Sequence, residues 1–113
     1  MKKYQLGEFE EIVMLTIGVL FKEAYAVSIK NEIKARLSRD VSVGALQSAL
    51  KRLEGKGDLK ARDGEGTQER AGRPKRYYEI TSLGKKAIEY SKNTRNELWN
   101  AIPDVVLNLK FNA

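Results

Sequence analysis

The feature that most constrains the fold is a change in the spacing of apolar residues near Gly57. Before this glycine, apolar side chains recur every three or four residues, as on one face of a helix. After it, residues 59–63 and 76–81 alternate between polar and apolar side chains, as strands do. Because a chain of 113 residues provides for one compact core, these strands must pack on the preceding helices. The expected fold class is therefore mainly α with a small β-hairpin (α+β).

Three amphipathic helices are expected before Gly57, over residues 8–22, 24–39 and 41–57. The first has apolar residues on most of its surface and should be largely buried. Ser42 is a good N-cap for the third. The other two helices each present one apolar stripe, which consists of Tyr25, Ile29, Ile33 and Leu37 in the second helix and of Val43, Leu46, Leu50 and Leu53 in the third.

The two expected strands are joined by residues 64–74, which are rich in turn-forming residues and too numerous for a tight turn. This pattern predicts a hairpin with a flexible tip, in which Tyr78 faces the core. Thr81 or Ser82 can cap a last helix that runs to Pro103 and would be about 30 Å long. Its distal apolar residues should overhang the core and meet a second chain; they are Leu98, Trp99 and Ile102. Residues 104–113 show no clear pattern.

Positive charge is concentrated in one part of the chain. The net charge is +6, and residues 51–76 carry nine basic and five acidic side chains. Four basic residues with no acid between them, Arg70, Arg73, Lys75 and Arg76, lie at the tip and return of the expected hairpin. Such residues could simply keep a loop hydrated, but a local excess of this kind is also a candidate contact for nucleic-acid phosphates.

The composition argues against several function classes. The chain has no cysteine and no histidine, which removes disulfides, the usual zinc ligands and the commonest catalytic base. We therefore expect no enzyme, no cofactor and no metal. The longest apolar run, residues 12–21, is too short to span a membrane, and the N-terminus does not resemble a secretory signal. These features are consistent with a cytoplasmic protein.

The order of the elements is that of a winged helix-turn-helix domain, over residues 1–81, followed by a C-terminal dimerisation helix and tail over residues 82–113. In such a domain the third helix is free to enter a DNA major groove. Its polar side, called the contact face below, consists of Ser42, Gly44, Ala45, Gln47, Ser48, Lys51 and Arg52. The same residues would suit a merely solvated helix. However, small side chains permit close approach to bases, Gln47 can pair with adenine, and the basic pair can bind phosphate.

Four segments follow one another over residues 6–88, namely LGEFEEIVMLTIGVL, AYAVSIKNEI, VSVGALQSALKRLEGKGDL and AGRPKRYYEITSLGKKAI. In these segments the sequence resembles the PadR-like transcriptional regulators. The resemblance implies a homodimeric repressor that binds double-stranded DNA, is relieved by an effector and dimerises through its C-terminal helix. Ala45 and Gln47 depart from the family pattern, which has a hydroxyl residue and a tyrosine at these positions.

Within that family the chain is similar to the short members, which have a single C-terminal helix and a tail. Such members include multidrug sensors that hold flat aromatic molecules at the dimer centre with a tryptophan of this helix, and Trp99 is similarly situated. Trp99 is thus a candidate contact for a planar aromatic effector, and equally a candidate apolar anchor of the dimer. A two-fold dimer would require a roughly palindromic operator.

A second function class remains open at this point. Winged helices also serve as protein-interaction modules that bind no DNA. The basic excess in residues 51–76 argues against this alternative, because it would be unnecessary for docking on a protein.

Overall fold

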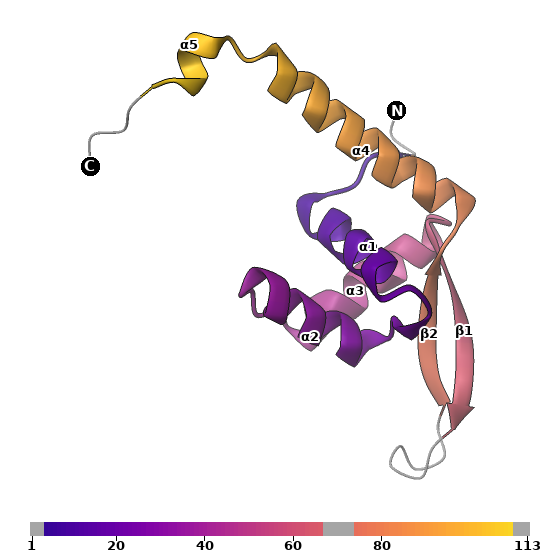
Figure 1. Cartoon of the computed structure of the whole chain (residues 1–113). Coiled ribbons are helices and arrows are strands. Elements are labelled where there is room, and N and C mark those ends of the chain that lie inside the picture. Colours follow the sequence, from indigo (N-terminus) through magenta and orange to yellow (C-terminus); the bar gives the residue numbers. More distant parts are fainter. Residues whose placement is uncertain (1–3, 67–73, 110–113) are drawn as a thin grey trace.

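The computed structural model of the chain describes residues 4–66 and 74–109. It is mainly helical with one two-stranded antiparallel hairpin, which confirms the predicted fold class. In chain order the elements are α1 (Glu8–Leu20), the short 3-10 helix η2 (Phe21–Glu23), α2 (Ala26–Leu37), α3 (Val43–Gly55), β1 (Leu59–Gly66), β2 (Pro74–Ile80), α4 (Ser82–Ala101) and α5 (Asp104–Leu107) (Figure 1).

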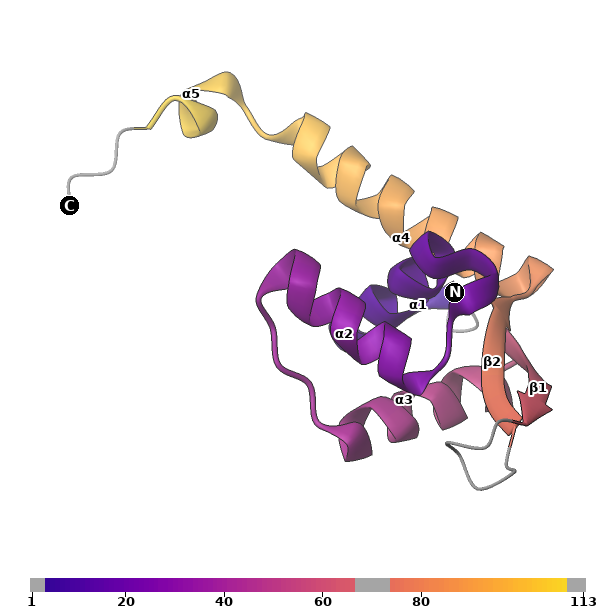
Figure 2. The same ribbon diagram turned by 60° about the horizontal axis from the view of Figure 1, so that its bottom comes forward.

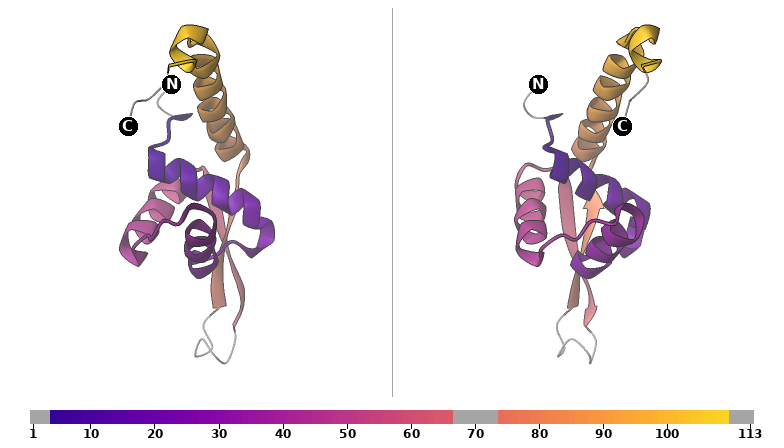
Figure 3. Two further views of the ribbon diagram at one scale, coloured as in Figure 1. Left: turned by 60° about the vertical axis from the view of Figure 1, so that its left-hand side comes forward. Right: turned by 90° about the vertical axis from the view of Figure 1, so that its left-hand side faces the viewer.

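Helices α1, α2 and α3 form a cluster against which the root of the hairpin packs (Figure 1). Helix α4 begins beside that root, crosses α1 and then projects away from the cluster. The far end of α4 and the far end of the hairpin lie at opposite ends of the molecule (Figure 3). The first turn of α3 lies at an outer edge of the cluster, away from the hairpin (Figure 2). We call β1, β2 and the segment that joins them the wing.

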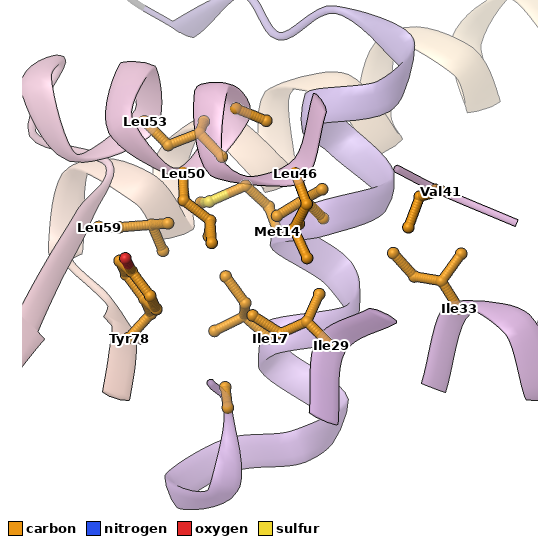
Figure 4. Close-up of a cluster of buried hydrophobic side chains, with 13 residues drawn as sticks. Met14, Ile17, Ile29, Ile33, Val41, Leu46, Leu50, Leu53, Leu59 and Tyr78 are labelled. Carbon is orange, nitrogen blue, oxygen red and sulfur yellow. The ribbon is translucent and has the colours of Figure 1, made fainter. Parts of the chain in front are cut away.

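The core draws side chains from every element of the cluster and from the wing (Figure 4). Its largest buried members are Met14 and Ile17 of α1, Ile29 and Ile33 of α2, Leu46, Leu50 and Leu53 of α3, and Leu59 and Tyr78 of the wing. The prediction that Tyr78 faces the core is thus confirmed. At about 25 cal/mol per Å² of apolar surface, burial of these side chains is the main favourable contribution to folding.

Three details of the predicted helices were wrong. Helix α1 is only half buried, because the side of it that bears Leu15 and Val19 has no helix packed on it. Val43 is 60% exposed, since it is the first residue of α3 and lies beyond the contact with α1 and α2. Leu37, at the last turn of α2, is also exposed. The stripe of α3 that is buried instead consists of Leu46, Ala49, Leu50 and Leu53.

Two caps begin the helices that flank the wing. The Ser42 Oγ atom accepts a hydrogen bond of 3.0 Å from the Ala45 N–H, which confirms its predicted role at α3. At α4 it is Thr81, not Ser82, whose hydroxyl accepts the Gly84 N–H at 3.0 Å. Each cap satisfies one backbone donor that the helix cannot satisfy itself.

The wing is fastened to the cluster along β2. Its register pairs Leu59 with Ile80 and Ala61 with Tyr78, and it becomes irregular between Asp63 and Gly66. The Tyr78 N–H donates a 2.8 Å hydrogen bond to the Ala24 carbonyl just before α2. The wing is therefore attached to the start of α2 as well as to the end of α3.

A compact junction joins the end of α3, the root of the wing and the start of α4. The Thr81 N–H donates to the Asp58 carbonyl at 3.1 Å, and the Thr81 hydroxyl donates to the Gly57 carbonyl at 2.6 Å. Gly57 has a φ of 87°, a conformation that favours glycine. The Asp58 side chain is fully buried, neither carboxylate oxygen has a hydrogen-bond partner among the described residues, and burial raises its pKa.

The first turn of α4 lies directly on this junction. A Cβ atom built at Gly84 would lie 2.1 Å from the Asp58 carbonyl oxygen and 2.9 Å from the Met14 methyl carbon. Only glycine allows the helix to approach so closely, because the obstructing oxygen belongs to the backbone.

We therefore expect Gly84→Ala to lower the free energy of unfolding by about 2 kcal/mol or more, since the carbonyl cannot move without breaking its bond to Thr81. Chemical denaturation of the purified protein measures this loss. Gly55→Ala, at the end of α3, is the matched control, because a Cβ there meets no atom within 4 Å. Equal stability of the two variants would contradict the close packing of Gly84.

Candidate nucleic-acid interface

The contact face of α3 is open along its whole length. All seven of its members, named above, are exposed. A Cβ at Gly44 would meet no other atom within 4 Å, so no described residue covers the outer side of the first turn at this position. That turn contains no acidic residue, and its unpaired N–H groups and the positive end of the helix dipole are therefore available to an anion. The cap of Ser42 holds this surface in place.

The two basic residues of the contact face differ in their surroundings. Lys51 is exposed and has no ion-pair or hydrogen-bond partner within the described chain. The Arg52 Nε atom lies 3.3 Å from Glu10 of α1, and Lys56 also approaches the Glu10 carboxylate, at 3.4 Å. Burial alone would raise the pKa of Glu10, but the Gly7 N–H, Lys56 and Arg52 outweigh it and lower that pKa. Glu10 thus remains ionised between two cations.

The wing supplies two described basic side chains beside α3. Lys75 places its ammonium 4.3 Å from the centre of the Tyr25 ring. The Arg76 Nη2 atom donates to both carboxylate oxygens of Glu54, at 3.2 and 2.9 Å, and this carboxylate raises the pKa of the guanidinium. Arg70 and Arg73, also predicted to bind phosphate, lie outside the described residues.

A small cleft of about 110 Å³ separates α3 from β2. It brings together two predicted contact residues from distant parts of the sequence, Gln47 of α3 and Arg76 of β2. The remaining lining residues are Tyr25, Ala26, Val27 and Tyr78. The contact face and the wing therefore lie side by side, on either side of this cleft.

Sequence reasoning missed the role of Tyr25 in this surface. Its ring contacts Tyr77 edge to face, with 5.5 Å between the ring centres, and lies under the Lys75 ammonium. Cation–π and aromatic contacts of this kind hold the return strand of the wing against the start of α2. No local pattern could indicate this, because Tyr25 and Tyr77 are far apart in the sequence and Tyr25 also fits an apolar helical stripe.

At the other end of the molecule, α4 presents apolar residues to solvent. Leu98 is 68% and Trp99 61% exposed, whereas Ile102 is half-buried. They border a shallow apolar hollow of about 600 Å³, together with Arg95 and Asn96. Arg95 also donates to the buried carboxylate of Glu11, at 2.6 Å, and so ties α4 to α1 just before the exposed segment begins.

The described residues contain no group of three or more acidic side chains that could hold a metal ion. No single helix in this part of the chain is long and apolar enough to cross a membrane. Residues 8–23 and 26–37 together would have the length and apolar composition of a membrane span, but the chain bends by 119° between these two helical segments.

Comparison with known proteins agrees with this geometry. The model of the transcriptional regulator PadR-like family matches residues 16–90, from the middle of α1 into α4. Among solved structures, a PadR-like transcription factor from Bacteroides fragilis is 32% identical with a TM-score of 0.71, and the match covers 88% of each chain. No protein with a curated description matches the sequence significantly.

More distant structures share the fold. A PadR family transcription regulator from Clostridium difficile R20291 is 24% identical, with a TM-score of 0.63 over 84% of this chain and 97% of the other. One from Eggerthella lenta DSM 2243 is 21% identical, with a TM-score of 0.65 over 86% and 82%. The family match covers about two thirds of the chain, from the second half of α1 through α2, α3 and the wing into α4, and on that ground this chain belongs to the PadR-like family of transcriptional regulators.

Proposed function

We propose that this chain is a cytoplasmic, homodimeric repressor that binds a palindromic operator in double-stranded DNA and is released by an effector. Membership of a family of DNA-binding transcriptional regulators supports the general role. The observation that carries the proposal is the open, small-residue first half of α3 beside the basic side chains of the wing. A family of regulators also makes an enzyme or a pure docking module the weaker interpretation.

In this proposal α3 enters the major groove with its first turn. Gly44 and Ala45 let the helix backbone approach the base edges, and the exposed Gln47 amide makes a bidentate pair with adenine. Lys51 contacts a phosphate further along the helix, while the wing follows the neighbouring backbone through Lys75 and Arg76, together with Arg70 and Arg73, which lie outside the described residues.

Filling the space at Gly44 tests this docking. We expect Gly44→Leu to weaken binding to the DNA upstream of the protein's own gene by at least about tenfold, because the new side chain occupies the space that the groove needs. The fold should be at least as stable, since leucine is a better helix former and meets no atom in this position. Fluorescence anisotropy at several salt concentrations measures the affinity.

The matched control is Gly55→Leu, which adds the same side chain to an equally open position at the other end of α3. It should bind as the unaltered protein does. If the unaltered protein shows no salt-sensitive binding to duplex DNA, the repressor proposal is wrong. Co-purification of a stable protein partner would then favour the interaction module.

The dimer is proposed from the exposed apolar end of α4. Leaving Leu98 and Trp99 in water forgoes burial that a second copy of the helix could provide. A two-fold pairing through α4 would place two copies of α3 on one side of the dimer, as a palindromic operator requires, with half-sites about one helical turn apart.

Leu98→Glu should convert the dimer into monomers at micromolar concentration, because a carboxylate would be buried without a partner. Sedimentation velocity measures the mass. Asn100→Glu adds the same charge to the opposite side of the same turn and should leave the dimer intact. A wild-type protein that sediments as a monomer would contradict the proposal.

The effector is proposed to be a planar aromatic compound held between the two copies of Trp99, over the apolar hollow at the end of α4. Trp99 is the sole tryptophan, so quenching of its emission reports directly on such stacking. We expect saturable quenching by at least one member of a diverse set of planar aromatics. If the emission stays unchanged across the set, Trp99 is only an anchor of the dimer.

A further inference from the structure

Arg76 is held by a carboxylate of the same chain. A single nitrogen, Nη2, donates to both oxygens of Glu54, at 3.2 and 2.9 Å. Glu54 lies in the last turns of α3 and Arg76 in β2, so the pair bridges the two elements proposed to bind DNA. Both side chains are partly exposed, at 53% for Arg76 and 36% for Glu54. The bridge therefore lies on the surface, within reach of an approaching duplex.

The charge of Arg76 is offset by more than the Glu54 carboxylate. A second carboxylate, that of Asp63 on the paired strand, lies 4.0 Å from Nη1. The centre of the Tyr78 ring lies 6.0 Å from the guanidinium carbon. In the free protein Arg76 is consequently a compensated cation, in contrast to Lys51, which no carboxylate of the described chain approaches.

A DNA phosphate cannot bind Arg76 at Nη2 without disturbing the ion pair between Arg76 and Glu54. A phosphate within hydrogen-bond distance of Nη2 would lie next to the Glu54 carboxylate, and like charges that close repel each other. An exposed ion pair contributes only about 0–1 kcal/mol, so exchange of the carboxylate for a phosphate is inexpensive. When Arg76 meets a DNA phosphate, the favourable outcome is therefore that the phosphate replaces the Glu54 carboxylate.

We propose that Glu54 is an intramolecular competitor of DNA for Arg76. In the free protein its carboxylate occupies the guanidinium, and in the complex a backbone phosphate replaces it. Glu54 thereby lowers the affinity of the chain for any duplex, whatever its sequence, because phosphate contacts supply the sequence-independent part of binding. This inference rests on the proposed function, since it presupposes that the wing lies against DNA.

Glu54 is also the acidic residue at the interface that can be changed most cleanly. It has no ion-pair partner other than Arg76 among the described residues. Glu10, in contrast, pairs with two cations and accepts the Gly7 N–H at the start of α1, so that its removal would disturb the fold.

The experiment measures binding of Glu54→Gln to a mixed-sequence duplex over a salt series. We expect the variant to bind three- to tenfold more tightly at low salt. The slope of log K against log salt should steepen by close to one, because one more phosphate is neutralised without displacing a carboxylate. Arg76→Gln should weaken binding, and Glu54→Gln introduced into Arg76→Gln should leave the slope unchanged.

Glu32→Gln is the matched control for net charge. Its carboxylate pairs with Arg36 within α2, so the substitution removes the same charge without releasing Arg76. Thermal unfolding of all variants verifies that each is folded at the temperature of the titration.

Two results would overturn the inference while leaving the proposed function intact. In the first, Glu54→Gln binds with the affinity and slope of the wild type. In the second, it binds more weakly, which would make Glu54 a support that positions Arg76. If the wild type itself fails to bind any duplex in a salt-sensitive way, the proposed function has failed, and this inference with it.

Discussion

The arrangement of the whole molecule depends on the contact between Gly84 and the carbonyl of Asp58. Thr81 makes that contact possible, because its N–H and hydroxyl hold the Asp58 and Gly57 carbonyls while its Oγ atom caps α4. The end of α3, the root of the wing and the start of α4 consequently meet at these few backbone atoms. A change in the direction of α4 must therefore be accommodated at the end of α3 and at the root of the wing. Helix α4, which is proposed to form the dimer, thus packs directly on the elements that are proposed to bind DNA.

A second point of attachment holds α4 against α1. Arg95, in the fourth turn of α4, binds the nearly buried carboxylate of Glu11, so that α4 is attached both at the Asp58 carbonyl and at α1. Beyond Arg95 the same helix turns Leu98 and Trp99 to solvent. One periodic sequence therefore does two things: its first half is part of the core, and its second half is an unpaired apolar surface. In the proposed dimer, the distance between the two copies of α3 would depend on the length and direction of α4.

The sequence was sufficient for the long helices and the strands, because the spacing of apolar residues is a local property, but it did not indicate the short helix α5. The Ser42 hydroxyl identified where α3 begins, and the start of α4 was narrowed to Thr81 or Ser82, of which Thr81 is the cap. The sequence failed where a residue's environment depends on distant partners. Val43 fits the stripe of its helix, yet its side chain is exposed, whereas Leu46 in the same turn is buried. For the same reason no sequence pattern could show that Arg76 lies on Glu54, or that Tyr25 lies beneath Lys75.

These pairings change how the net charge of +6 should be interpreted. Nine basic side chains of the described chain lie within 4 Å of a carboxylate, Arg52 and Arg76 among them. Few of the cations near α3 are therefore free, and each new contact with a phosphate would exchange one anionic partner for another. Such an exchange yields little net free energy on a random duplex, because the lost ion pair offsets part of the gain. The proposed contacts between bases and Gly44, Ala45 and Gln47 would have no competitor among the described residues, since all three side chains are exposed. On the proposed function, a surface of this composition would limit the sequence-independent part of the affinity and leave discrimination between sequences to the major groove.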